Sequence, residues 1–238
     1  VKNTVDTSVI AVYYHGVPVL DATGWGGFYF NNAQSAQYAW NLGVGFGAKP
    51  HNYGRVWFPC FDNFVERSTF NYHVLTNQNR TAYCNGIRTL TEVVGQDSLL
   101  THWQLQEEIP SYLASVSVCN YVEVQQSFPG IEGQDIPILL VSKAIDTTDM
   151  KNSMVHLDDW MVAAENHYGP YRWPRVGYCA VPFNGGAMEH ATNISYPLFA
   201  IDGTLSWETL YAHEVSHHWW GDLITCRNAS DMWINEGW

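Results

Sequence analysis

The sequence predicts an α+β fold in which an antiparallel, β-rich part precedes a part that mixes strands and helices. Up to about residue 130, apolar and polar residues alternate in short segments, as they do in strands with one buried face. Clear helical periodicity begins only beyond that point. Hydrophobic residues make up 46% and aromatic residues 15% of the 238 residues, which is enough for a sizeable packed core.

The alternating segments of the first part lie at 70–75, 99–105 and 113–124. Turn residues such as Asn85-Gly86 separate them, so we expect an antiparallel sheet or a sandwich. The stretch 128–135 is the expected boundary between two domains. It divides the chain into a partial β-rich N-terminal domain, residues 1–130, and the beginning of a second domain, residues 131–238.

The second part begins with a short apolar strand at 136–141. A helix is expected from about Thr148 to His167, capped by Thr147 or Thr148. A further β segment, about 175–182, leads into a glycine-containing segment at 185–190.

A second helix is expected over about 207–220. Ser206 is the predicted N-cap, Glu208 lies in the first turn where the helix dipole favours an anion, and Gly221 follows the end. Another helix is expected to open near Met232.

Charge and composition exclude some classes of function. Eleven Lys and Arg residues against 23 Asp and Glu residues give a formal charge of −12, which argues against a nucleic-acid partner. The longest apolar runs are too short to span a bilayer. The five cysteines are widely spaced and odd in number, so we expect buried free thiols, with a disulfide left open. The compartment and the oligomeric state stay open.

The predicted helix 207–220 carries a metal-binding pattern. His213 and His217 are four residues apart and so share one face of the helix, where both imidazoles can reach one ion. Catalytic zinc takes three protein ligands and keeps one position for water, and Glu236 is the natural third ligand. Glu214 then points towards that water rather than the metal. The pattern predicts a zinc site with its own general base; the alternative is an amphipathic helix with two histidines paired by chance.

Several segments together resemble the gluzincin aminopeptidases, the superfamily of aminopeptidase N and leukotriene hydrolase. They read Gly-Ala-Met-Glu-His at 186–190, His-Glu-Val-Ser-His-His-Trp-Trp-Gly-Asp at 213–222 and Trp-Ile-Asn-Glu-Gly at 233–237. In the first part, Arg-Val-Trp-Phe-Pro-Cys-Phe-Asp at 55–62 is similar to the family's Phe-Pro-Cys-x-Asp segment. The resemblance implies that the second part is the start of a thermolysin-like zinc peptidase domain.

The resemblance also implies a zinc-dependent aminopeptidase that hydrolyses the N-terminal peptide bond of peptides. His213, His217 and Glu236 would ligate Zn²⁺. Glu214 would be the general base that takes a proton from the zinc-activated water.

Peptides with a free N-terminus are the implied substrates. Glu189 would contact the α-amine, which is largely cationic near neutral pH. The backbone of Gly186 and Ala187 would pair with the peptide as an added strand, and Met188 and His190 complete the substrate-binding segment.

Three departures from the family pattern stand out. His190 replaces an Asn and either alters the pocket or adds a titrating group. A second contact to the amine is missing or is supplied by His51 or Asn52. The family's N-terminal sheet begins before residue 1 and its catalytic domain continues past Trp238, so we expect a fragment that binds zinc weakly and hydrolyses little.

Two other functions stay open at this point. One is a non-catalytic, zinc-stabilised peptide-binding homologue, against which the intact Glu214 argues, because a scaffold needs the ligands but not the base. The other is a side activity on lipid epoxides, as in the leukotriene-hydrolase branch.

Three residues near the predicted ligands have two expected roles each. His218 is expected to face solvent or to lie behind the ligands. Asp222 and Asp231 are candidate acceptors for the ligand imidazoles or ordinary turn residues.

Overall fold

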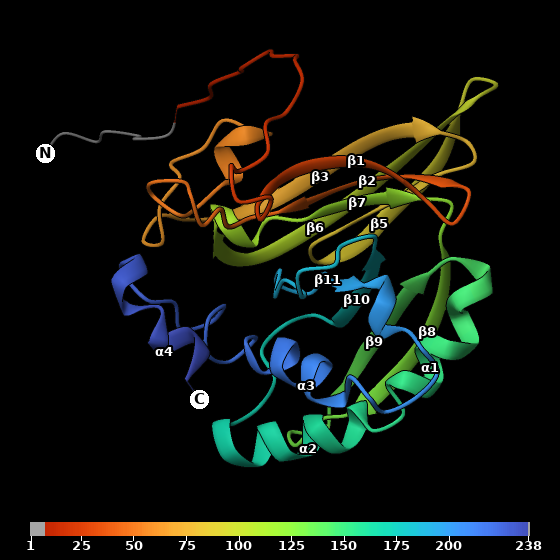
Figure 1. Ribbon diagram of the computed structural model, residues 1–238, viewed down its shortest axis with the longest axis vertical. Coiled ribbons are helices and arrows are strands. Elements are labelled where there is room, and N and C mark those ends of the chain that lie inside the picture. Colours follow the sequence, from red (N-terminus) through yellow and green to blue (C-terminus); the bar gives the residue numbers. More distant parts are fainter. Residues whose placement is uncertain (1–7, 238) are drawn as a thin grey trace, which may run out of the picture.

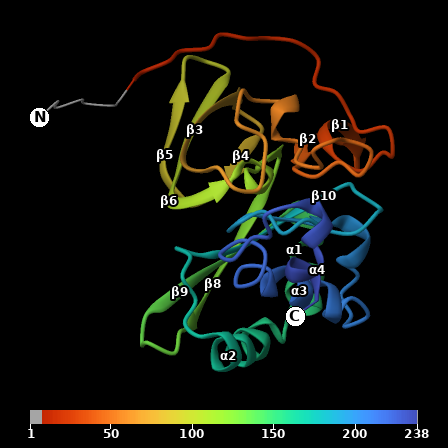
Figure 2. The same ribbon diagram turned by 90° about the vertical axis from the view of Figure 1, so that its left-hand side faces the viewer.

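The computed structural model describes residues 8–237. Its strands form three sheets (Figure 1). Two of the sheets lie together at one end of the molecule, and the third sheet and the helices occupy the other end, as Figures 1 and 2 both show.

The first sheet has four antiparallel strands and carries a large share of the aromatic core. In spatial order they are β1 (Gly27–Ala33), β2 (Ala36–Leu42), β7 (Val116–Cys119) and β4 (Thr81–Cys84). Tyr29 on β1 stacks on the buried Trp40 of β2, with ring centroids 4.2 Å apart. Aromatic side chains bury large areas, so this contact anchors the outer hairpin to the core.

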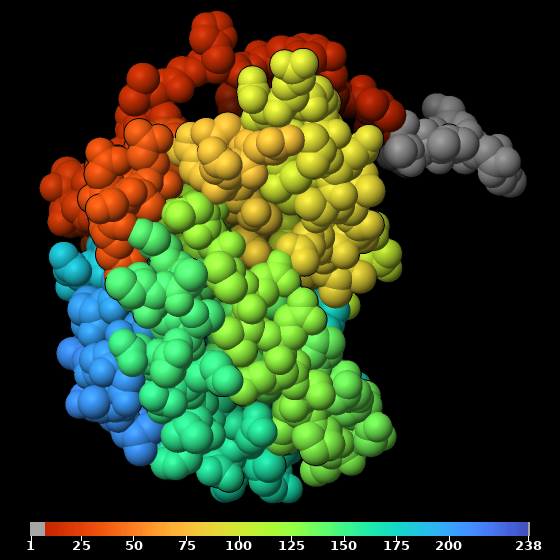
Figure 3. All heavy atoms as spheres, turned by 90° about the vertical axis from the view of Figure 1, so that its right-hand side faces the viewer, coloured from red at the N-terminus to blue at the C-terminus, as the bar shows by residue number. Residues whose placement is uncertain are grey.

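The second sheet has three antiparallel strands. In spatial order they are β3 (Arg67–Asn77), β6 (Ser98–Pro110) and β5 (Ile87–Val94). The strands predicted at 70–75 and 99–105 lie within β3 and β6 and are confirmed. β5 is exposed along its whole length. In the space-filling view the yellow residues of this sheet sit directly above the green residues of the third sheet and its helices (Figure 3).

The third sheet is mixed. In spatial order its strands are β11 (Ile194–Pro197), β10 (Val176–Val181), β9 (Asp135–Ser142) and β8 (Val122–Pro129). β9, β10 and β11 are parallel neighbours, and β8 is antiparallel to β9. Every residue of β10 is buried, as expected for a central strand covered on both faces. The strands predicted at 136–141 and 175–182 are confirmed.

Four α-helices accompany this sheet: α1 (Thr147–Ser153), α2 (Leu157–Tyr168), α3 (Glu208–Ser216) and α4 (Trp233–Glu236). Short 3-10 turns complete the structure: η1 (Gly54–Val56), η2 (Ser111–Leu113), η3 (Ala144–Asp146), η4 (Leu198–Ala200) and η5 (Ala229–Asp231). α3 lies between the sheet and α2 (Figure 1). It is thereby held on two sides; it carries His213, and His217 follows directly as its C-cap residue.

The predicted α+β class, with antiparallel strands preceding the helical part, is confirmed. The domain boundary between residues 130 and 131 remains a prediction. It falls in the turn that joins β8 to β9, two strands of the same sheet.

Three expected elements have different bounds in the structure. The helix expected over 148–167 is interrupted between α1 and α2, where His156 leaves helical geometry and bonds Glu208 of α3 (Nδ1 to Oε1, 2.7 Å). The strand expected over 113–124 is divided between β7 and β8, which belong to different sheets.

The helix expected over 207–220 ends at Ser216, and its N-cap is Trp207 rather than Ser206. The Ser206 hydroxyl instead accepts a hydrogen bond from Thr204 (2.8 Å), so it caps nothing.

The cysteines are all free, as expected. Four are buried, and Cys60 is partly exposed. Between residues 8 and 237, no helix combines the length and apolar character needed to cross a membrane.

Candidate metal centre

The two motif histidines converge because of the local geometry of α3. Side chains four residues apart are neighbours on a helix surface. The buried Tyr211 and Val215 fix the opposite face of α3 in the core, which turns the histidines outward into a cavity. The Nε2 atoms of His213 and His217 lie 3.0 Å apart.

Glu236 reaches the same point from α4. Its Oε2 atom lies 3.3 Å from Nε2 of His213 and 3.5 Å from Nε2 of His217. Within residues 8–237, this is the one group of three or more His, Cys, Asp or Glu side chains whose donor atoms converge in this way.

The three donor atoms fit one tetrahedral metal ion. An ion with bonds of about 2.0–2.1 Å separates its tetrahedral ligands by about 3.3 Å. The three observed separations of 3.0, 3.3 and 3.5 Å bracket this value. Two imidazoles and one carboxylate form a borderline donor set of the kind that suits zinc.

A backbone contact fixes the orientation of His217. Its Nδ1 atom lies 3.0 Å from the carbonyl oxygen of Trp220. Since a carbonyl only accepts, Nδ1 carries the hydrogen and the lone pair of Nε2 faces the other two ligands. The His217 side chain is 3% exposed, whereas those of His213 and Glu236 are 45% and 46% exposed. The centre therefore has one buried ligand and an open side.

Asn235 ties Glu236 to the rest of the molecule. The buried Asn235 side chain accepts a hydrogen bond from the Cys226 amide (3.0 Å) and donates one to the Tyr112 hydroxyl (3.4 Å). Tyr112 in turn donates to the carbonyl of Gly221 (3.3 Å). These bonds connect α4, the loop after α3, and η2 of the first part of the chain.

Arg67 at the start of β3 holds the same loop. Its guanidinium donates to the carbonyl of Asp222 (2.6 Å) and to the hydroxyl of Thr225 (2.9 Å), and also to the carbonyl of Glu108 (3.0 Å). The position of Glu236 thus depends on residues far away in the sequence.

Two further carboxyl groups share the cavity with the ligands. Burial raises the pKa of Glu214 well above its ordinary value, and the nearby Glu189 and Glu236 carboxylates raise it further. Burial also raises the pKa of Glu189. Conversely, the hydrogen bond between His213 and Glu236 lowers the pKa of Glu236 and raises that of His213. Three carboxyl groups around two imidazoles favour a cation at this point.

The cavity has a volume of about 380 Å³ and two kinds of wall. The polar lining residues are His213, Glu214, His217, Glu236 and Glu189. The apolar lining residues are Trp25, Val44, Phe46, Met188, Leu210 and Met232, and Gly186 and Ala187 also line the cavity. Trp25 packs against Phe46, with ring centroids 5.3 Å apart.

The segment 186–189 runs beside β11 and ends at the cavity. The amide and carbonyl of Met188 exchange hydrogen bonds with Ser195 (3.0 and 2.9 Å). Along the described part of the chain, the backbone of Gly186 and Ala187 has no hydrogen-bond partner. Gly186 has φ +140°, and a Cβ there would lie 2.9 Å from the Trp25 ring, so glycine is required.

Comparisons with known proteins agree with this geometry. Residues 154–238 match the Peptidase family M1 domain. Aminopeptidase B of Rattus norvegicus is 27% identical over 187 residues, which cover 77% of this chain and 27% of that protein. Aminopeptidase N of Oryctolagus cuniculus is 26% identical over 193 residues, which cover 76% of this chain and 20% of that protein. The chain thus resembles the gluzincin aminopeptidases in sequence.

Solved structures of M1 peptidases share its fold. An M1 zinc metallopeptidase from Deinococcus radiodurans superimposes with a TM-score of 0.74 at 20% identity, over 93% of this chain and 48% of that one. Another structure of the Deinococcus protein, with a TM-score of 0.75, holds a Tyr-Ser-Ala substrate. The present chain therefore spans about half the length of these M1 structures and a smaller share of the curated aminopeptidases.

The structure brings most of the predicted site residues together, but His190 is an exception. His213, His217, Glu236, Glu214, Glu189, Gly186, Ala187 and Met188 all line the cavity. The His190 side chain is fully buried away from it, between Asn41 (3.4 Å) and Ser195 (3.1 Å). Burial lowers the pKa of His190 to about 3, so it adds no charge near neutral pH. The prediction of a substrate contact by the His190 side chain is therefore corrected to a role in the core.

Neither candidate for a second amine contact lines the cavity. His51 bonds the carbonyl of Gly45 (3.0 Å), and Asn52 is buried. The apolar residues Val44 and Phe46 from the same part of the chain line the cavity instead.

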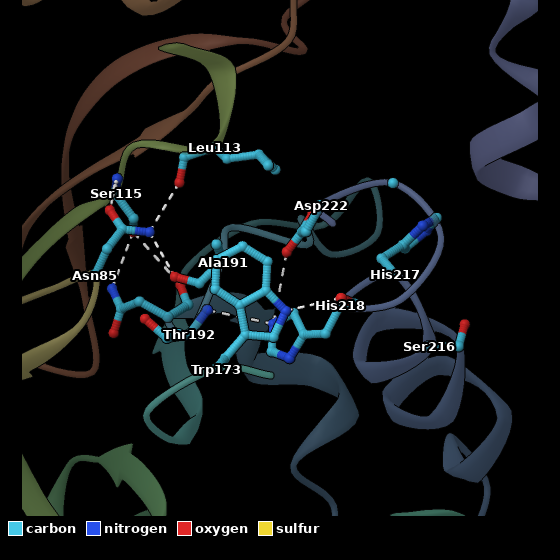
Figure 4. A network of polar contacts seen from close by, with 12 residues as sticks. Asn85, Leu113, Ser115, Trp173, Ala191, Thr192, Ser216, His217, His218 and Asp222 are labelled. Carbon is cyan, nitrogen blue, oxygen red and sulfur yellow. Dashed lines mark hydrogen bonds and ion pairs between the residues drawn. The ribbon is translucent and has the colours of Figure 1, made fainter. Parts of the chain in front are cut away.

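His218 and Asp222 form a buried network behind the ligands (Figure 4). His218 extends away from His217, with Nδ1 2.7 Å from the Tyr171 hydroxyl and Nε2 accepting from the Thr192 amide (3.3 Å). Its Nε2 also lies 3.7 Å from the Asp222 carboxylate. Burial lowers the pKa of His218 to about 3 and raises the pKa of Asp222 well above its ordinary value.

The structure separates the alternatives that the sequence left open for three of these neighbours. His218 does not face solvent but is buried behind the ligands. The acceptor for His217 is the Trp220 carbonyl and not Asp222. Asp231 lies in η5 and bonds neither ligand imidazole in the described structure.

Reasoning from sequence missed Asn235, Tyr112, Arg67, Trp25 and Phe46. Asn235 had one usable signal, because an amide directly before a ligand is well placed to orient it. The other four lie more than a hundred residues before the motif, and no spacing rule connects them to it.

Proposed function

We propose that this chain carries the zinc centre and the amine-recognition segment of an aminopeptidase, which hydrolyses the N-terminal peptide bond of peptides. The observation that carries the proposal is the convergence of His213, His217 and Glu236 on one point, beside the separate carboxyl groups of Glu214 and Glu189. A structural zinc site would be closed by a fourth protein ligand and would need neither Glu214 nor Glu189 beside it.

The three ligands would hold Zn²⁺, whose ordinary bond lengths match their spacing. When bound, zinc would polarise the scissile carbonyl and lower the pKa of a water molecule towards neutrality. The half-exposed edges of His213 and Glu236 leave room for that water and the carbonyl.

Glu214 is the general base in this proposal. It precedes Val215 on α3 and lines the cavity, but it is not one of the three converging residues His213, His217 and Glu236. Its carboxylate would take a proton from the attacking water and deliver it to the leaving amine. A buried position strengthens such proton transfer because bulk water does not compete.

Glu189 and its neighbours would position the peptide. The Glu189 carboxylate lines the same cavity and would pair with the cationic α-amine, which limits cleavage to the first residue. The unpaired backbone of Gly186 and Ala187 can accept the peptide as an added strand.

Hydrolysis of short peptides and aminoacyl nitroanilides by the zinc-loaded chain tests the proposal. Glu214→Gln should lower turnover by roughly 10²-fold or more while zinc is retained. Glu92→Gln, an exposed change on β5, is the matched control and should change nothing. N-acetylated peptides should not be cleaved.

Each negative result has a distinct meaning. Full activity in Glu214→Gln with zinc bound would refute the role of Glu214. Zinc-dependent peptide binding without hydrolysis, in this chain and in longer forms of it, would favour the non-catalytic homologue. Equal cleavage of acetylated peptides would refute N-terminal selection by Glu189.

A further inference from the structure

A pair of histidines lies on the second sheet, on elements that contribute nothing to the cavity. His73 is on β3 and His102 is on β6, directly opposite each other in the antiparallel register. Residues opposite in such a ladder hold their Cβ atoms about 4.5–5.5 Å apart on the same face of the sheet. Figures 1 and 2 place β3 and β6 at the opposite end of the molecule from α2 and α3.

The two imidazoles approach closely. Nδ1 of His73 lies 3.0 Å from Nε2 of His102, and the ring centroids are 4.0 Å apart with the ring planes at 60°. Each of these nitrogens carries either a hydrogen or a lone pair. Two lone pairs at this distance repel unless a proton or a metal ion lies between them.

We propose that His73 and His102 form a second, independent metal site for a divalent transition-metal ion, with Cu²⁺ as the preferred ion. An ion with bonds of about 2.0 Å to nitrogens 3.0 Å apart subtends an angle of about 97°. That angle is close to the about 90° between neighbouring ligands in tetragonal Cu²⁺ complexes.

The donor set and its surroundings favour this class of ligand. Two imidazoles suit Cu²⁺, Ni²⁺ and Zn²⁺, and affinity for a given site is greatest for Cu²⁺ in this series. Within residues 8–237, no third His, Cys, Asp or Glu completes the pair, so water would fill the other positions. The net charge of −12 attracts cations to the protein surface.

The backbone also prepares the site in advance. β3 and β6 pair continuously from Phe70 to Asn77 on β3, with His73 in the middle of that run. The strands are already ordered before the ion binds, so binding costs little conformational entropy of the chain.

Copper titration of the 238-residue chain, first loaded with one equivalent of zinc, tests this proposal. Because Cu²⁺ can also replace zinc at the His213 centre, electron paramagnetic resonance should show a Cu²⁺ with two nitrogen ligands that is bound in addition to one ion, zinc or copper, at that centre. His73→Asn and His102→Asn should each weaken this binding at least tenfold. His15→Asn, which removes one exposed unpaired histidine, is the matched control and should leave binding unchanged.

The alternatives give different results. Unchanged copper binding in both His73→Asn and His102→Asn would overturn the proposal. Stoichiometric release of zinc on copper addition, with no second ion bound, would assign the copper to the His213 centre and would also overturn it. Absence of bound copper in the unaltered chain would leave a hydrogen-bonded histidine pair only. None of these outcomes depends on peptidase activity.

Discussion

The metal centre draws its side chains from two segments that are held in different ways. α3 is packed between the third sheet and α2, and its buried residues Tyr211 and Val215 fix its rotation. α4 has only four residues, too few to be stable as an isolated helix. It depends on the side-chain bonds of Asn235 to Cys226 and Tyr112. The histidines are thus placed by local helix geometry, and Glu236 is placed by contacts between distant parts of the chain.

This difference suggests how the centre assembles. The His213 and His217 pair exists wherever α3 is formed, whereas the third ligand arrives only when the loop after α3 is docked on Tyr112 and Arg67. Metal binding should therefore report on the contact between the first and second parts of the chain. Four substitutions test this contrast, in decreasing order of their effect on the metal.

The largest effect is expected from His217→Ala, which removes the buried ligand. The loss of zinc affinity should exceed the about 10–100-fold that changes behind a ligand typically cause. Competition with a fluorescent chelator measures it, and His15→Ala serves as the unpaired control. Zinc binding with unaltered affinity would show that the ion is held elsewhere.

Asn235→Ala should have the next largest effect. It removes both bonds that hold α4, and we expect zinc affinity to fall about 10–100-fold while α3 keeps its structure. Asn235→Asp retains the acceptor for the Cys226 amide and should lose less. Hydrogen exchange should increase at the Cys226 amide but not within α3. Equal protection in the variant and the parent would mean that α4 is held by other contacts.

Arg67→Ala should affect stability more than the metal. It removes bonds from a charged donor to the carbonyl of Asp222 and to Thr225, and one such bond contributes about 1.5–3 kcal/mol. We expect the free energy of unfolding to fall by about 2–5 kcal/mol and zinc affinity to fall less than tenfold. Arg67→Lys keeps the charge but not the forked geometry, so it should rescue only part of the loss. If Arg67→Ala lowered zinc affinity more than Asn235→Ala does, Arg67 and not Asn235 would be the main support of Glu236.

The same contrast explains what the sequence could predict. The spacing of His213 and His217 follows from helical periodicity, so the pair and its orientation were accessible from five residues. Glu236 could be predicted only because a catalytic zinc site needs a third ligand. Nothing in the sequence around it explained how its side chain reaches the ion. Likewise, the strands within 70–75 and 99–105 were predicted from alternation, but their pairing in one sheet, separate from the sheets that contain β7 and β8, was not. Alternation specifies a buried face and not which strands pair.

The errors have two physical origins. His190 was assigned to the substrate-binding segment, and His218 either to solvent or to a place behind the ligands, because they adjoin site residues in sequence. Both are buried, and each is bonded to groups from other segments, such as Asn41 and Thr192. Likewise, Ser206 was assigned as an N-cap from its residue type alone, yet its hydroxyl bonds Thr204. Tertiary contacts decided the positions of His190 and His218, whereas a local bond between residues two apart decided that of Ser206.

The smallest effect on the metal is expected from His190→Asn, which should act on the pH dependence of stability. His190 is fully buried, faces the uncharged Asn41 and Ser195, and has its pKa lowered from 6.5 to about 3 by burial. The unfolded chain therefore binds a proton at this residue between pH 6.5 and 3, and the folded chain does not. The contribution of the neutral His190 imidazole to the free energy of unfolding is fully present above pH 6.5. It is lost as the pH falls below that value, by about 1.4 kcal/mol per pH unit.

Denaturant unfolding at pH 7 and pH 5 isolates this contribution. In the parent, His190 should account for about 2 kcal/mol of the stability lost between these two values. His190→Asn should remove that share and flatten the dependence, whatever its effect on stability at pH 7. Zinc affinity at pH 7 should remain within a few-fold of the parent, because His190 contacts no ligand. An unchanged pH dependence would mean that His190 exchanges protons in the folded chain, and its assignment to the core would fail.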